Sequence, residues 1–200
     1  MRNLVNTISK VSCLFLFATA NTSLVYADDI TDSINEGLKY YKDGQYSDAA
    51  TSLNYASQLI QQKKGGSLKL LFPEPLSGWK AEDATSETSG AAFGVGISAE
   101  REYNKGQSAV TIEIVADSPM LQGVMMMLSN PMISQADGGK LIKVGGQKAI
   151  VKYDSTNKSG DIQVVVANRF LVSINGDGVT NADLTNYAKA VDYKKIAALP

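Results

Sequence analysis

Few side chains in this sequence could carry out chemistry. The 200 residues contain no histidine and a single cysteine, Cys13. Catalysis near neutral pH most often uses histidine or a cysteine thiolate. The sequence therefore excludes Ser-His-Asp and Cys-His triads, and zinc or haem sites with histidine ligands. Carboxylate, lysine, tyrosine or Ser–Lys chemistry remains.

Two short motifs could serve that remaining chemistry, and neither has the required context. Ser155 and Lys158 are spaced as Ser-x-x-Lys but lie in a polar link between two strand-like segments, whereas catalytic use requires the serine at the start of a helix in a pocket. Gly94-Val95-Gly96 is not followed by Lys-Ser/Thr or by a helical pattern, so no nucleotide-binding fingerprint is met.

A cluster of polar residues near the C-terminus suggests calcium. Asn175-Gly176-Asp177-Gly178 is followed by Asn181 and Asp183, but Val179 stands at the fifth position of the loop and no glutamate closes it. Glycine and Asn/Asp are also what a strand-to-helix turn needs, with Thr180 as the helix cap. We expect a turn, and no catalytic residue, cofactor or metal.

Methionine is the unusual feature of the composition, because five of the six lie between Met120 and Met132. Three hypotheses remain open: a helix packed on a sheet with methionine filling gaps, a Cu(I) site made of thioethers, or an adaptable apolar groove for a peptide or lipid. Met125, Met126 and Met127 are consecutive, and neighbouring helical residues point about 100° apart. At least one of them should therefore lie near the surface.

The N-terminus has the pattern of a secretory signal peptide. Arg2 and Lys10 precede an apolar run, residues 11–20, that is too short to span a bilayer as a helix. Val25 and Ala27 place small residues before a cut after Ala27. We expect a signal peptide at 1–27 and a periplasmic location. Cleavage leaves 173 cysteine-free residues with 17 basic and 20 acidic side chains, a net charge of −3. That charge argues against a nucleic-acid partner, and no later run is long enough for a transmembrane segment.

Residues 30–64 have the apolar spacing of two helices broken at Gly44. The pattern resembles a tetratricopeptide repeat, in which small residues let antiparallel helices approach closely; it is carried by Gly37, Tyr40, Gly44, Tyr46, Ala49, Leu53 and Ala56. Gln61 replaces the usual closing proline, and no second copy follows. Since one hairpin cannot bury its apolar side alone, it must pack on its own sheet domain, a second subunit or a partner.

Basic residues and glycines at Lys63-Lys64-Gly65-Gly66 predict the end of the second helix. Pro73 and Pro75 then predict a stiff extended connector. The domains expected are therefore a helical hairpin at 28–66 and a second domain at 67–200.

Period-two alternation dominates the second domain. Strands are expected at 91–103 and 108–115, then a helix at 119–130 stopped by Pro131. A three-turn antiparallel meander over 141–174 follows, with turns at Gly145-Gly146 and Ala167-Asn168. A capping-box-like start at Thr180 predicts a closing helix. The fold class is α+β: an N-terminal helical hairpin plus an antiparallel sheet flanked by helices.

The opening Phe72, Pro73, Gly78 and Trp79, together with this order of elements, resembles the PsbP/Mog1-like class over residues 70–199. The resemblance implies an accessory or binding factor rather than an enzyme, and it assigns no functional residue.

These observations predict a non-catalytic periplasmic protein that contacts an envelope protein or a small apolar ligand. The candidate partner-binding residues are Tyr40, Tyr46, Tyr55, Met125, Met126 and Met127. The alternatives are a Cu(I)-binding protein that uses the Met120–Met132 cluster, and a hydrolase that uses carboxylate or lysine chemistry.

Overall fold

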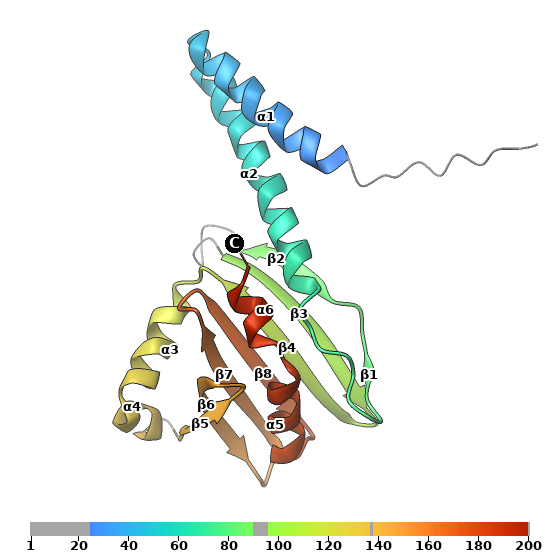
Figure 1. The fold of residues 1–200 in the computed structure, drawn as a ribbon. Helices are drawn as coiled ribbons and strands as arrows, with labels where there is room; N and C mark the ends of the chain where they lie inside the picture. Colours follow the sequence, from blue (N-terminus) through green and yellow to red (C-terminus); the bar gives the residue numbers. More distant parts are fainter. Residues whose placement is uncertain (1–24, 90–95, 137, 200) are drawn as a thin grey trace, which may run out of the picture. The chain divides into compact units, whose positions relative to one another are not determined.

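The computed structural model describes residues 25–89, 96–136 and 138–199, and it divides into two compact units, one ending at Leu53 and one starting at Asn54 (Figure 1). The predicted signal peptide falls outside the described residues except for its last three positions, which open the first helix. The predicted division at residue 67 stays a prediction; the two units meet inside the second helix.

The first unit is an antiparallel helical pair, as predicted. Helix α1 (Val25–Lys42) turns at Gly44, where φ is +76°, into α2 (Tyr46–Lys69). A Cβ on Gly37 would lie 2.8 Å from Leu53 Cγ, so glycine is what lets the two helices approach here. On the other side of the pair, Ser52 Oγ donates a hydrogen bond of 3.0 Å to Glu36.

The predicted end of α2 at Gly65-Gly66 is wrong, because the helix continues to Lys69. Gly65 does not end the helix but lets it pack closely: a Cβ there would lie 3.0 Å from Ser86 Oγ. Leu68, one turn further on, is 2% exposed in the sheet core. Burying a leucine favours one more turn by about 2 kcal/mol, which offsets the cost of about 1 kcal/mol for each of the two glycines inside the helix.

The second unit is built on one eight-stranded antiparallel sheet. The predicted α+β fold class is therefore confirmed. The path of the sheet is β1-β3-β4-β8-β7-β6-β5, with β2 paired to β3. The strands are β1 (Lys80–Ala81), β2 (Thr85–Ser89), β3 (Gly96–Lys105), β4 (Ser108–Ala116), β5 (Lys140–Val144), β6 (Gln147–Asp154), β7 (Ser159–Val166) and β8 (Phe170–Asp177).

Helices cover opposite faces of this sheet (Figure 1). Helices α5 (Asn181–Ala190) and α6 (Tyr193–Ala197) pack on the inner face with Leu68, Phe72 and Trp79. Helix α3 (Met120–Ser129) packs on the outer face over Ile150 and Leu171, and α4 (Pro131–Ala136) follows it.

The proline connector is fixed to the inner face. Tyr103 is fully buried, and its hydroxyl donates a 2.7 Å hydrogen bond to the Pro73 carbonyl. Burial is the main cause that raises the pKa of Tyr103 to about 12. The Tyr187 ring packs between those of Tyr103 and Trp79, tilted to the first and perpendicular to the second, at 4.6 and 5.2 Å between centroids. These contacts explain why Phe72 and Trp79, the opening of the second domain, are buried.

The meander and its turns follow the sequence prediction. Gly145 and Gly146 have φ of +55° and +84°, and Ala167 and Asn168 have φ of +50° and +54°. Thr180 forms the predicted capping box with Asp183. The predicted turn before it is shorter than expected, because Asn175, Gly176 and Asp177 still belong to β8 and only Gly178 and Val179 connect the strand to the helix.

Helix α3 ends at Ser129, so the predicted stop before Pro131 is confirmed; Pro131 itself begins α4, consistent with the preference of proline for a first helical turn. Other local features differ from the prediction. Strands β1 and β2 and helix α6 were not predicted from the sequence. Their patterns are too short for periodicity to detect. The predicted strand at 91–103 is β3 from Gly96 onward, and 91–95 lie outside the described residues.

Candidate functional site

An apolar face of the helical pair is exposed. On α1, Ile34, Leu38 and Tyr41 lie on one side of the helix, and on α2, Tyr46 and Leu53 do. The two sides meet, because the Tyr41 and Tyr46 rings are 5.8 Å apart and Leu53 lies over Gly37. All five side chains are more than 40% exposed, and Tyr46 is 68% exposed. We call these five residues the hairpin face.

The described carboxylates within the two helices lie away from the hairpin face, whereas Asp43 lies in the turn between Tyr41 and Tyr46. Asp29, Asp32 and Glu36 of α1 are about half a turn around the helix from Leu38, and Asp48 is likewise across α2 from Tyr46. Covering the hairpin face would therefore desolvate none of these carboxylates. That removes one of the larger penalties of forming an interface.

The structure brings only one predicted tyrosine to this face. Tyr46 lies on it, Tyr40 is half-buried on the flank of α1, and Tyr55 is exposed elsewhere. Tyr55 is nine positions after Tyr46, which is two and a half helical turns, so the two side chains project from opposite sides of α2. The sequence reasoning missed Tyr41 as a surface residue, although its spacing from Ile34 and Leu38 already gave an apolar stripe.

The three consecutive methionines point in different directions. Met127 packs in the outer-face cluster, Met126 is 63% exposed, and Met125 lines a depression of about 250 Å³ beside Lys148. The prediction that at least one lies near the surface is confirmed. Thioethers that diverge in this way do not form a three-sulfur copper site from these residues alone.

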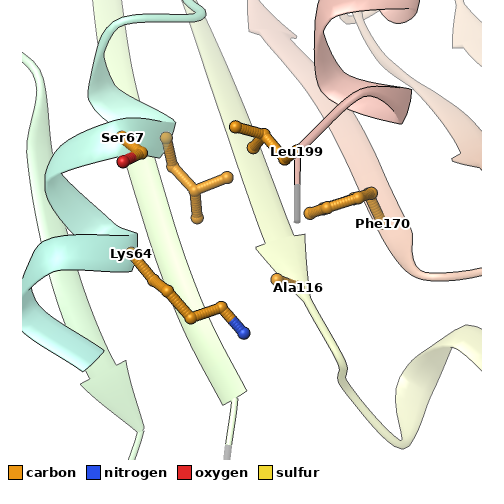
Figure 2. Close-up of a pocket in the computed structure, with 6 residues that line it drawn as sticks. Lys64, Ser67, Ala116, Phe170 and Leu199 are labelled. Atoms are coloured by element: carbon orange, nitrogen blue, oxygen red, sulfur yellow. The ribbon is translucent and has the colours of Figure 1, made fainter. Parts of the chain in front are cut away.

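A second small cavity lies between the end of α2 and the sheet (Figure 2). It is about 40 Å³, is mostly apolar, and is lined by Lys64, Ser67, Leu68, Ala116, Phe170 and Leu199. Small-molecule sites are about 300–1,000 Å³, so this space is too small for a substrate. The Lys64 amine is 3.2 Å from Asp117, whose other oxygen is 3.6 Å from Arg169.

Two carboxylates face each other on the outer face of the sheet. Glu100 of β3 lies directly opposite Glu113 of β4. Burial, and then the charge of Glu100, raises the pKa of the Glu113 carboxyl. Ser173 is the neighbour of Glu113 on β8. Over the described residues, no three His, Cys, Asp or Glu side chains are grouped so that they could hold a metal ion.

Comparison with known protein families, curated proteins and solved structures finds no match for this chain. Among the described helices, none combines the length and the apolar character needed to cross a membrane.

Proposed function

We propose that this protein is an exported, periplasmic, non-catalytic binding or accessory protein that contacts another envelope protein through the hairpin face. The observation that carries the proposal is the exposure of Ile34, Leu38, Tyr41, Tyr46 and Leu53 on one side of a helical pair; the described carboxylates within its two helices point elsewhere. Aromatic and aliphatic side chains of this kind dominate protein interfaces.

The partner proposed is a helical surface of an envelope protein. Tetratricopeptide-like hairpins bury their apolar sides by stacking on further helices, and the resemblance of residues 37–56 to such a repeat points the same way. We also propose that residues 70–199 resemble the PsbP/Mog1-like class, a resemblance that favours an accessory role.

Site-specific photocrosslinking in the exporting cell tests this proposal. A photoreactive phenylalanine analogue at Leu38 or Tyr46 should give a defined crosslinked band, since both side chains belong to the hairpin face and project outward from it. The same analogue at Lys39 or Ser47, one position further along each helix, is the matched control and should give none. Equal crosslinking from all four positions, or from none, would contradict the proposal. A crosslink to a second copy of this chain would show that the hairpin face mediates self-association and would contradict the proposal of an envelope partner.

The Cu(I) and hydrolase alternatives gain no support from the geometry, because the consecutive methionines diverge and the apolar cavity is small. The Cu(I) alternative is tested by a Cu(I) titration of the wild type and of a variant in which Met125, Met126 and Met127 are changed to leucine. Stoichiometric binding that the variant loses would revive it.

A further inference from the structure

The α3–α4 segment is apolar and uncharged but is not covered on its outside. From Ser118 to Ala136 the sequence contains no charged residue. Leu121 and Val124 are buried against the sheet, yet Met126 is 63% and Met132 80% exposed, and Met120 and Ile133 are also exposed. A helix that is apolar all round is normally buried on every side. Something else is therefore expected to cover the outer side of this segment.

Two lysines lie on the same face of the sheet as α3. Lys143 of β5 lies directly opposite Lys148 of β6, on the face that carries Ile150 under α3. Both are exposed, and like charges directly opposite on neighbouring strands disfavour each other. An anion above the pair would remove that repulsion.

Two surface depressions are each lined by residues of a helix and by a lysine of a neighbouring strand. The depression of about 250 Å³ is lined by Met125 and Leu128 of α3 and by Gln147 and Lys148 at the start of β6. Another, of about 450 Å³, is lined by Gln135, Gly138, Gly139, Lys140 and Leu141. Among the residues that the structure describes, no carboxylate lines either depression. Helix α3, with the exposed methionines that it carries, and the cationic side chains of β5 and β6 thus lie on the same outer face of the sheet.

The charge of this region differs from that of the rest of the chain. Residues 118–153 contain four lysines and one aspartate, a net charge of +3, and the other residues from Asp28 onward carry −6. On the same sheet face, Asp161 lies directly opposite Lys152 rather than near Lys143. Glu100 and Glu113 belong to β3 and β4, which β8 and β7 separate from the two lysine-bearing strands.

We propose that this surface, made of Met120, Met126, Met132, Ile133, Leu141, Lys143 and Lys148 and here called the Met–Lys patch, docks on an anionic lipid bilayer. The unbranched methionine side chains adapt to the disordered headgroup boundary, while the lysines attract anionic headgroups. The protein lies on the membrane and does not span it. This role is separate from the hairpin face, which is left available for a protein partner.

The test is flotation of the full chain without its predicted signal peptide, mixed with vesicles. We expect the protein to float with vesicles of phosphatidylglycerol and phosphatidylethanolamine at low salt. It should remain in solution with vesicles of phosphatidylcholine alone. Binding should weaken as salt rises, because the Debye length falls from about 10 Å at 0.1 M to about 3 Å at 1 M.

Two pairs of variants test the two components of the patch. Lys143→Gln with Lys148→Gln should lower the partition coefficient by roughly tenfold or more, since each lysine near an anionic surface contributes several-fold. Lys189→Gln with Lys194→Gln changes the charge equally on the α5–α6 side and should leave binding unchanged. Met126→Gln with Met132→Gln should also weaken binding, whereas Leu70→Gln, at a site 85% exposed on the connector, should not. All these side chains are exposed, so the fold is retained.

Three results would overturn the proposal: no flotation with anionic vesicles at low salt, equal flotation with phosphatidylcholine, or equal losses in both lysine pairs. A stable dimer that the Met126 and Met132 changes dissociate would show that a second copy covers the patch instead, and would also overturn it. Because no variant touches the hairpin face, failure here leaves the crosslinking result of the proposed function unaffected.

Discussion

The two faces of the sheet differ in what covers them. On the inner face, Val110, Ile112, Val172 and Ile174 are fully buried beneath α5, α6 and the connector. On the outer face, β4, β8 and the neighbouring β7 carry Thr111, Glu113, Ser173 and Gln163 at the intervening positions. An apolar cluster near Leu171 lies at one end of that face, and α3 covers it.

This difference separates folding from surface chemistry within one sheet. The inner face holds the main apolar core, and burial of apolar surface supplies most of the favourable free energy of folding. The outer face combines a small apolar cluster with carboxylates at β3–β4 and lysines at β5–β6. We therefore expect substitutions facing inward to change stability, and most of those facing outward to change binding.

The largest effect is expected from a cavity in the inner face. Ile174→Ala should lower the free energy of unfolding by about 4 kcal/mol, because the side chain is fully buried at the centre of the sheet. Urea denaturation measures the loss, with Ser173→Ala on the outer face as the neighbouring control. A loss below about 1 kcal/mol would mean that the inner face is not the main core.

Two adjacent glycines test how tightly α6 covers the inner face. A Cβ on Gly145 would lie 2.5 Å from the Tyr193 ring, whereas a Cβ on Gly146 would meet nothing within 4 Å. Both residues have positive φ, which alone costs about 1–2 kcal/mol in alanine. Thermal unfolding should show Gly145→Ala to be more destabilising than Gly146→Ala by about 1 kcal/mol or more. Equal losses would contradict the contact with Tyr193.

The carboxylate pair of the outer face makes stability depend on pH. The pKa of Glu113 is raised in the folded protein, so its ionised form opposes folding at pH values above the folded pKa. Below the unfolded value of about 4.3 the carboxyl is protonated in both states and the penalty vanishes. Glu113→Gln should therefore stabilise the protein at pH 7 by up to about 1 kcal/mol. The gain should disappear as the pH falls through the titration range, and a gain independent of pH would argue against charge as its cause.

The smallest effect is expected at the outer side of α3. Met126→Gln should change the free energy of unfolding by less than about 0.5 kcal/mol, because the side chain is already in water. Met127→Gln should cost more, since Met127 packs against the apolar cluster under α3. Denaturation of the two variants side by side measures the contrast. Equal losses would place Met126 in the core.

Local pattern was sufficient for much of the fold. Alternation predicted the inward positions Ile162, Val164 and Val166 of β7, and the Gly145-Gly146 pair predicted its turn. Thr180 and Asp183 predicted the capping box of α5. Gly65 misled the prediction, because a glycine that ends a helix and one that lets a helix pack closely look alike in sequence. The two kinds of glycine differ only in which residues pack against them in the folded protein.

For the candidate sites, the sequence supplied residue types but not their grouping. Helical periodicity predicted that the three consecutive methionines diverge, yet Tyr55 was grouped with Tyr46 although α2 points them to opposite sides. The pairing of Lys143 with Lys148 depends on the hairpin register, and their proximity to Met125 depends on where α3 lies.

The amino-acid sequence by itself determined the chemistry that is possible and the periodicity of each element, because side-chain type and spacing are local properties. It specifies a chain without histidine, an apolar helical stripe and strands that alternate in polarity. Only the tertiary structure decided which of the apolar surfaces were covered. Burial depends on contacts between residues far apart in the chain, as between Leu68 and the sheet, and such contacts leave no periodic trace in the sequence.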